Sequence, residues 1–266
     1  MGFWEFDAGE AMRIDCHSHC SIKRGSNRHP DRLVADARQL GIDKLCCSYP
    51  TDSMTAGPEE ISRLNDEILK AMQMYPDVIL GQCFINPGLV EFAQEEITRC
   101  VVDGGMIGLK VYNQYRMDEP VFHPVLERCS DLGVPILMHA GHATDAETIS
   151  NQPRLSGADH FIEPARLFPK TIFIIGHLGG GGDWEWEIKA MRECPKNVYM
   201  DTSGSVIDAG MIEKAVRDLG ADRLLFATDG ATERGIGKIM DAEISQREKE
   251  LIWGENFQRI LSMRKV

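Results

Sequence analysis

The chain has 266 residues, of which 43% are hydrophobic and 26% charged, a composition typical of soluble globular proteins. This length suits one large domain or two small ones, and the composition excludes disordered, collagen-like and coiled-coil proteins. The net charge of −12, from 41 acidic and 29 basic residues, repels a phosphate backbone, so we expect no nucleic-acid partner. No stretch approaches the roughly 18 apolar residues of a membrane span, so we expect no membrane association.

The N-terminus and the cysteines bear on where the protein works. Residues 1–11 contain Glu5, Asp7 and Glu10 and no apolar block, which indicates an N-terminal extension and not a signal peptide. None of the eight cysteines forms a C-x-x-C motif, and the adjacent Cys46 and Cys47 cannot easily bridge each other. We therefore expect a cytoplasmic protein whose thiols are reduced and act mostly as small buried hydrophobic groups.

Short apolar runs recur along the chain at a spacing of roughly thirty residues. They are residues 12–17, 44–49, 78–85, 106–112, 134–139, 171–177, 197–201 and 223–229. Most are almost continuously apolar, as in Ile-Phe-Ile-Ile-Gly at 172–176. This pattern is typical of parallel strands that are buried on both faces.

Helical patterns fill the intervals between these runs. We expect helices at residues 31–40, 58–74, 89–102, 121–132, 184–193 and 208–219, a loop and a helix within 144–168, and a final helical segment at 238–263 that breaks near Gly254. Strands and helices alternating in this way predict an α/β protein, a single-domain (β/α)₈ TIM barrel over residues 1–266. A doubly wound open sheet is the alternative, but residues 15–19 do not resemble the glycine fingerprint that usually follows its first strand.

Polar side chains with metal-binding or acid–base chemistry close several of the predicted strands. They are His17 and His19 on the first, Lys110 on the fourth, His139 on the fifth, His177 on the sixth and Asp229 on the eighth. In a barrel the carboxyl ends of the strands share one face, where barrel enzymes react. His17 and His19 are two residues apart and therefore point the same way along a strand. Imidazoles and a carboxylate together suit zinc or another divalent transition metal.

Taken singly, some of these residues have a purely structural interpretation. His139 closes an apolar strand and could be a satisfied core histidine, and Asp229 could cap the following helix. The four glycines after Leu178 resemble a close backbone approach more than a phosphate loop, because no P-loop lysine accompanies them.

Seven sequence pieces occur in a fixed order between residues 13 and 261. They are IDCHSH, GLKVY, VPILMHAG, FIIGHLGG, the DTSG at Asp201–Gly204, LLFATDG and the terminal IWGENFQRIL. On these pieces the chain resembles the amidohydrolase superfamily, specifically the amidohydrolase-related branch that includes aminocarboxymuconate-semialdehyde decarboxylase. Asn256 looks like the landmark of the family's closing helix.

The resemblance implies a mononuclear metal site. His17, His19, His139 and Asp229 would be the ligands, most simply of one Zn²⁺, with Mn²⁺, Fe²⁺ or Ni²⁺ as alternatives. His177 would act near the metal-bound water as a general acid/base, and Asp229 would also be catalytic by accepting a proton from that water. A second ion is expected only if Lys110 is carbamylated. We favour a charged Lys110 that orients an acidic substrate, and a lysine paired with a barrel carboxylate is the third alternative.

Side chains at and beyond the strand ends are candidates for substrate binding. We expect Lys110, Tyr112, Arg28 and His142 to bind substrate, and Arg24, Tyr115, Arg116 and Ser205 are further candidates. Arginine binds carboxylates in a bidentate manner, so a small carboxylate-bearing molecule is the expected partner. A homodimer is the default oligomeric state for a barrel of this kind.

Three functions are consistent with these residues. The first is a metal-dependent hydrolase that cleaves a small ester, lactone or amide; the alternative is a metal-dependent non-oxidative decarboxylase or hydratase of a small carboxylic acid. The third is a non-catalytic metal-binding barrel, which the complete set of site residues argues against. The eighth strand reads Ala-Thr-Asp-Gly where Gly-Ser-Asp-x-Pro is commoner, and the chain has no large insertion. Both departures place hydrolysis ahead of decarboxylation.

Overall fold

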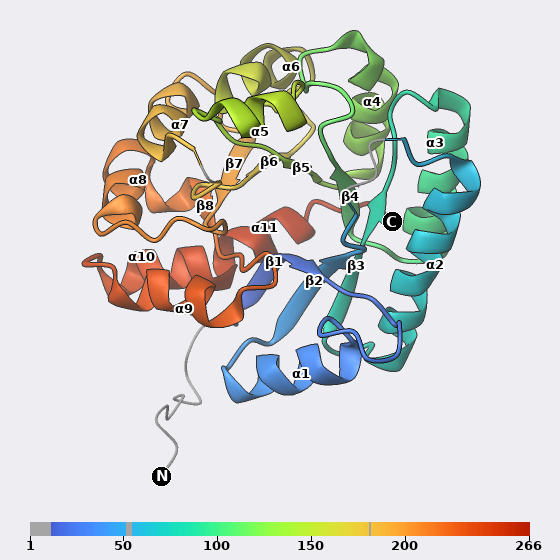
Figure 1. Cartoon of the computed structure of the whole chain (residues 1–266), viewed down its shortest axis with the longest axis horizontal. Helices are drawn as coiled ribbons and strands as arrows, with labels where there is room; N and C mark the ends of the chain where they lie inside the picture. The colour runs from blue at the N-terminus through green and yellow to red at the C-terminus, as the bar shows by residue number, and fades with distance from the viewer. Residues whose placement is uncertain (1–11, 52–54, 181) are drawn as a thin grey trace.

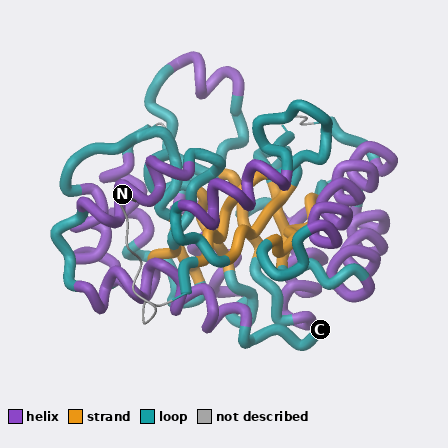
Figure 2. The backbone as a smooth tube through the Cα atoms, turned by 90° about the horizontal axis from the view of Figure 1, so that it is seen from below, coloured by secondary structure: helices purple, strands orange, loops and turns teal. Residues whose placement is uncertain are grey.

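The computed structural model describes residues 12–51, 55–180 and 182–266, so the N-terminal extension expected at residues 1–11 lies outside it. Eight parallel strands follow one another in the order β1 to β8, and the helices lie around them (Figure 1). Seen from the side, the strands occupy the centre of the molecule and the helices its outside (Figure 2). The predicted (β/α)₈ barrel is therefore confirmed.

Each strand overlaps one of the predicted apolar runs. The strands are β1 Ile14–His19, β2 Lys44–Ser48, β3 Ile79–Phe84, β4 Gly108–Val111, β5 Ile136–His139, β6 Phe173–Gly176, β7 Val198–Asp201 and β8 Leu224–Leu225. The chain after β8 lies along β1, because the amide of Cys16 donates to the carbonyl of Phe226 at 3.0 Å and the amide of Asp229 donates to the carbonyl of His17 at 2.8 Å. These bonds bring the first and last strands together and nearly close the barrel.

The helices connect the strands on the outside of the barrel. They are α1 Pro30–Gln39, α2 Pro58–Met74, α3 Val90–Ile97, α4 His123–Leu132, α5 Ala146–Asn151, α6 Ile162–Leu167, α7 Trp184–Met191, α8 Met211–Leu219, α9 Thr232–Asp241, α10 Gln246–Glu250 and α11 Asn256–Leu261. Helix α2 matches its predicted bounds, and Pro58 occupies its first turn, where proline is tolerated. No helix in the described part of the chain is both long and apolar enough to cross a membrane.

The expected break of the last helical segment near Gly254 is wrong. Helix α9 already begins at Thr232, and the interruption lies at residues 242–245, where Ser245 and Glu248 form a capping box that starts α10. The backbone passes Gly254 within a π-helical turn that leads directly into α11. Glycine is needed there because a Cβ atom would collide with the carbonyl oxygen of Met12. Gly254 thus marks a close approach between the segment before β1 and the segment after β8, not the end of a helix.

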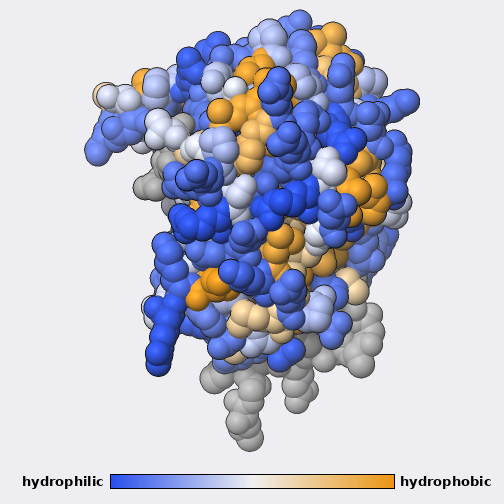
Figure 3. All heavy atoms as spheres, turned by 90° about the vertical axis from the view of Figure 1, so that its right-hand side faces the viewer, coloured by the Kyte–Doolittle hydropathy of each residue, from blue (hydrophilic) through white to orange (hydrophobic). Residues whose placement is uncertain are grey.

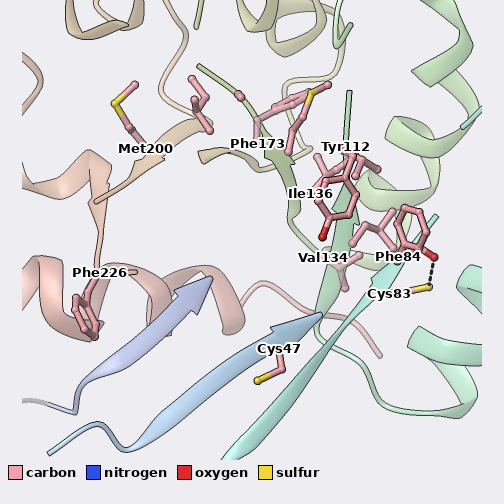
Figure 4. Close-up of a cluster of buried hydrophobic side chains, with 14 of the residues drawn as sticks. Cys47, Cys83, Phe84, Tyr112, Val134, Ile136, Phe173, Met200 and Phe226 are labelled. Atoms are coloured by element: carbon pink, nitrogen blue, oxygen red, sulfur yellow. Dashed lines mark hydrogen bonds between the residues drawn. The ribbon is translucent and has the colours of Figure 1, made fainter. Parts of the chain in front are cut away.

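Apolar side chains from neighbouring strands and helices fill the core. Figure 4 shows part of it, with Phe84, Ile136, Phe173, Met200 and Phe226 on or beside successive strands. One face of the surface is mainly hydrophilic, with hydrophobic residues scattered between (Figure 3). All eight cysteines are buried and free, as expected for small apolar groups. Buried polar groups are unusual in such a core, and several of them lie at the carboxyl ends of the strands.

Asn256 is the polar residue on which the closing helix depends. It is fully buried, and its Nδ2 donates to the carbonyls of Ala221 at 2.7 Å and Leu224 at 2.9 Å. Asn256→Ala removes both donors from a buried site, so we expect the free energy of unfolding to fall by about 2–4 kcal/mol. Urea denaturation measures this loss, and Gln258→Ala on the exposed side of the same helix is the control. A loss no larger than that of the control would contradict the assigned role.

A buried acid predicts a pH dependence of stability. Glu187 is 2% exposed, and one of its carboxyl oxygens has no hydrogen-bond partner in the described part of the chain. Burial raises its pKa from 4.5 to about 8, against the hydrogen bond from the amide of Ala158. Between these values the folded state holds a proton that the unfolded chain has lost. Unfolding therefore releases a proton, and the free energy of unfolding falls as pH rises.

Glu187→Gln should remove this dependence, because glutamine keeps the acceptor for Ala158 and cannot ionise. We expect the variant to match the wild type near pH 4.5 and to be more stable at pH 8, with the difference growing by about 1 kcal/mol per pH unit between. Denaturation of both proteins across this range measures the difference. A constant offset at every pH would show that Glu187 does not titrate as proposed.

Candidate active site

Three of the predicted metal ligands converge at the carboxyl end of the barrel. His17 and His19 end β1, and Asp229 follows β8. The Oδ1 atom of Asp229 lies 2.9 Å from Nε2 of His19 and 3.7 Å from Nε2 of His17, and one donor atom of each residue lies within 4.8 Å of the others. Ligands of a tetrahedral ion with bonds of about 2.1 Å stand roughly 3.4 Å apart. The donor set and its spacing therefore fit a single divalent cation.

The backbone that carries these ligands is fixed by a second acid. Asp15 is fully buried, and its carboxyl group accepts hydrogen bonds from the amide of His17 and from the amide and hydroxyl of Thr228, at 2.6–3.1 Å. It thereby ties β1 to the segment that delivers Asp229. Asp229 itself has a φ of +50°, a left-handed conformation that is uncommon for residues with a side chain and is enriched at functional sites. Gly230 follows with a φ of +79° and completes this turn.

Asp201, at the end of β7, orients His17. Its Oδ2 lies 2.8 Å from Nδ1 of His17, and both side chains are fully buried. The carboxylate accepts the hydrogen bond from Nδ1–H, so Nε2 of His17 carries the lone pair, 2.9 Å from Nζ of Lys110 and 3.7 Å from Oδ1 of Asp229. Carboxylates play this role behind most metal-binding histidines, and they fix both the tautomer and the ring orientation. Sequence reasoning missed Asp201 as a site residue, although a carboxylate at a strand end had already singled out Asp229.

A second hydrogen-bond chain sets the protonation of His177. The hydroxyl of Ser203 donates to Oδ1 of Asp201 at 2.5 Å, so its oxygen can only accept from Nδ1 of His177, also at 2.5 Å. The Nε2 atom of His177 is then left with a lone pair, which lies 3.0 Å from Nδ1 of His139 and 3.9 Å from Oδ2 of Asp229. The three residues hold an imidazole acceptor at the mouth of the barrel. Ser203 was also missed by sequence reasoning.

The loop that carries Ser203 is held from outside by Lys238 of α9. Its ammonium group donates to the carbonyls of Thr202, Ser203 and Gly204 at 2.9–3.3 Å. Gly204 has a φ of +103°, and the backbone of Gly179 lies where its Cβ would be. The loops after β6 and β7 therefore pack closely against each other, and Lys238 stabilises this contact.

Lys110 contacts one of the candidate ligands, His17, directly. It is fully buried, its Nζ is 2.9 Å from Nε2 of His17, and it lies over the ring of Tyr112 at 4.7 Å. Burial lowers its pKa to about 8, against the opposing charges of Asp229 and Asp201. Within the described residues its partner is an imidazole and not a carboxylate. This position favours neither the carbamylated nor the ion-paired alternative, and it keeps Lys110 beside the ligand set.

Burial also sets the charge of the histidines. It lowers the pKa of His17 and His177 far below the usual value, lowers that of His19, and brings that of His139 to about 4. Burial alone would raise the pKa of Asp229, but the hydrogen bond from His19 and the nearby imidazoles hold it well below its ordinary range. The cluster therefore consists of neutral imidazoles around an ionised carboxylate, which is the state that metal ligands require.

A cavity of about 190 Å³ opens above this cluster. Its lining includes His139, His177, Ser205, Asp229 and Arg234. Arg234, on α9, carried no strand-end signal and is absent from the predicted site. Asp229 of the candidate metal site, His177 and an arginine thus line one small cavity.

The comparison with known sequences decides the family. A sequence model described as amidohydrolase matches residues 14–256. The chain belongs to the amidohydrolase family. The predicted resemblance is therefore confirmed over nearly the whole chain.

Relatives of this amidohydrolase include decarboxylases. A gamma-resorcylate decarboxylase of a Polaromonas species is 25% identical over 290 aligned positions, which cover 88% of this chain and 87% of that protein. A 2-amino-3-carboxymuconate-6-semialdehyde decarboxylase of Dictyostelium discoideum is 27% identical over 79 positions, 29% of this chain and 22% of that protein.

Solved structures show the same fold. A putative amidohydrolase from Staphylococcus aureus has a TM-score of 0.76 at 18% identity, with 94% of this chain and 99% of that one covered. A dihydroxybenzoic acid decarboxylase from Polaromonas with bound manganese has a TM-score of 0.73 at 19% identity, with 95% and 97% covered. In this amidohydrolase the His17–His19–Asp229 donor group supports a divalent metal, without a preference for zinc.

His139 reaches the same mouth but has other neighbours. Its Nδ1 lies 3.0 Å from Nε2 of His177, and its Nε2 lies 3.1 Å from Oε1 of Gln152. Neither three-residue donor group found in the described chain includes it. Its role as a fourth ligand stays a prediction. Gln152 follows α5, in the stretch where the sequence pattern is weakest.

The predicted substrate residues of this amidohydrolase separate into two sets. Tyr112 lies near His139, with ring centroids 6.2 Å apart, and the guanidinium carbon of Arg28 lies 3.7 Å from the point where a Cβ on Gly230 would stand. His142, in contrast, stacks on Trp186 of α7 at 3.9 Å. Arg116 pairs with Asp118 at 3.3 Å. Arg28 and Tyr112 therefore adjoin the metal cluster, whereas His142 lies in an aromatic contact of the outer loops.

Proposed function

We propose that this protein is a metal-dependent, non-oxidative decarboxylase of a small aromatic carboxylic acid. The observation that carries the proposal is that Asp229, which forms a possible metal site with His17 and His19, lines one cavity together with His177, in a chain similar along 88% of its length to a gamma-resorcylate decarboxylase. Decarboxylation, the alternative in the sequence-based interpretation, therefore stands ahead of hydrolysis. The eight free thiols support work in a reducing compartment, the cytoplasm.

His17, His19 and Asp229 would hold the cation, with His139 as the candidate fourth ligand. A bound divalent ion supplies positive charge that polarises a substrate oxygen. Asp201 keeps Nε2 of His17 turned toward the site, and Lys110 adds a buried donor beneath it. Arg28, next to Gly230, supplies a guanidinium that attracts a carboxylate to the mouth.

Decarboxylation needs a proton at the carbon that loses its carboxyl group. The C–C bond breaks, CO₂ leaves, and the electron pair of that bond forms the new C–H bond. We assign this step to His177, which lines the cavity and whose Nδ1–H is held by Ser203 and Asp201. A proton received at Nε2 gives an imidazolium that Asp201 stabilises through Ser203, and this proton can pass to the ring carbon.

Hydrolysis is the second candidate. The observation that favours it is the 3.9 Å separation between Nε2 of His177 and Oδ2 of Asp229. An imidazole and a carboxylate that flank one position can take a proton from water and return it to a leaving group.

The test combines metal analysis with two substrate panels. Protein produced with manganese or with zinc is dialysed, its metal content is measured, and it is assayed for CO₂ release from hydroxylated benzoates and for acid production from esters and lactones. We expect about one ion per chain and CO₂ release. Acid production alone would favour hydrolysis, and a chain without stoichiometric metal would overturn both functions.

A further inference from the structure

We propose that Arg234 binds a second anionic group of the substrate, so that the preferred substrate is a compact aromatic acid with two anionic substituents. This inference rests on the proposed function and deepens it by assigning the outer part of the cavity. Arg234 lies in the first turn of α9, five positions after Asp229. It lines the cavity that His139, His177 and Asp229 also line.

The guanidinium of Arg234 is available to a ligand. Within residues 12–51, 55–180 and 182–266, it takes part in no ion pair or hydrogen bond. Lys238, one turn further along α9, is by contrast fully engaged by three backbone carbonyls. Asp229 is the acid of this cavity, and its carboxylate is occupied by His19 at 2.9 Å. The positive charge of Arg234 is therefore not neutralised by an acid within the cavity.

A neighbouring cavity limits where an anion can lie. Arg234 also borders a larger hollow of about 560 Å³ between residues 207–213 and α9. Its lining has four acids, Asp208, Glu213, Glu233 and Asp241, against Arg234 and Lys238, so the excess of negative charge disfavours an anionic group there. An anion bound to Arg234 is therefore favoured on the side of the mouth that holds His177. The protein's net charge of −12 makes such a local cation more important for attracting an acid.

Cavity size restricts the remainder of the substrate. The mouth encloses about 190 Å³, below the 300–1,000 Å³ that is usual for sites of drug-sized ligands. One carboxylate at the metal cluster and a second anionic group at Arg234 leave room for little more than a single ring. An arginine binds such a group through two parallel hydrogen bonds, which select carboxylate over neutral substituents.

Binding of two unreactive acids tests this assignment. Calorimetry on the metal-loaded protein compares benzoate, with one carboxylate, and isophthalate, with two. We expect isophthalate to bind at least about tenfold more tightly, because a charge-assisted bidentate contact is added. Arg234→Gln should reduce this ratio to about one, whereas Arg234→Lys should retain part of it. Arg32→Gln, which removes the same charge from the exposed face of α1, is the matched control and should behave as wild type.

Equal affinity of the wild type for the two acids, or no binding of either, would overturn the inference. So would a ratio that Arg234→Gln leaves intact. If the ratio depends on Arg234 but no aromatic acid releases CO₂, the anion site stands and the proposed decarboxylation fails.

Discussion

Under the proposed function, Asp229→Asn will weaken metal binding and abolish the decarboxylation of aromatic acids. The substitution keeps the shape of the side chain but replaces the ionised carboxylate that lies 2.9 Å from His19 and 3.7 Å from His17. Loss of residues that only support metal ligands typically costs 10–100-fold in affinity. We therefore expect at least about a hundredfold weaker metal binding here. Metal content after dialysis and CO₂ release measure the two effects.

Asp131→Asn, on the exposed surface of α4, is the matched control and should keep both metal and activity. Circular dichroism of Asp229→Asn should show an intact barrel, because its backbone bond to His17 does not involve the carboxylate. Full metal content in a folded Asp229→Asn protein would show that the cation is held elsewhere.

His177→Asn will separate catalysis from metal binding. Its imidazole offers Nε2 to the cavity, and general acid–base groups contribute about 10²–10⁴-fold to rate. We expect kcat to fall within this range while the metal content stays near that of the wild type, because His17, His19 and Asp229 are unchanged. Steady-state kinetics on metal-loaded protein provide the measurement.

Ser203→Ala gives an intermediate case. It leaves the imidazole of His177 in place but removes the hydroxyl that joins its Nδ1 to Asp201. We expect a smaller loss of kcat than in His177→Asn. A His177→Asn protein that loses its metal as well would make His177 a ligand, and unchanged kcat in that variant would remove it from the mechanism.

The strands and the convergence of three candidate ligands could be predicted because they depend on local patterns. Continuous apolar runs identify strands buried on both faces, and parallel strands in a barrel place their last residues on one face. His17, His19 and Asp229 were found in this way. Asp201 met the same criterion but was noted only as part of a motif. Its partnership with His17 spans 184 residues and depends on barrel closure, which no local pattern encodes.

Residues on loops and helices escaped prediction for a different reason. Gln152 and Arg234 lie on segments whose position depends on how the outer helices pack, and neither interrupts an apolar run. The end of the chain shows the same limit. A glycine often follows the end of a helix, which led to the expected break. Gly254 is instead needed because a Cβ atom would collide with the carbonyl oxygen of Met12, in a segment far away in the sequence.

The meeting of β1 with the segment after β8 also links assembly to affinity for the cation. The bonds from Thr228 to Asp15 join residues 213 positions apart, and the same junction delivers Asp229 to His17. Joining such distant segments carries an entropic penalty that grows with their separation, so we expect this contact to form late in folding. An incompletely folded barrel would therefore have His17 and His19 without Asp229 beside them. A cation that binds only the completed site shifts the folding equilibrium toward the folded barrel by mass action. We therefore expect cation availability to influence how much folded protein accumulates.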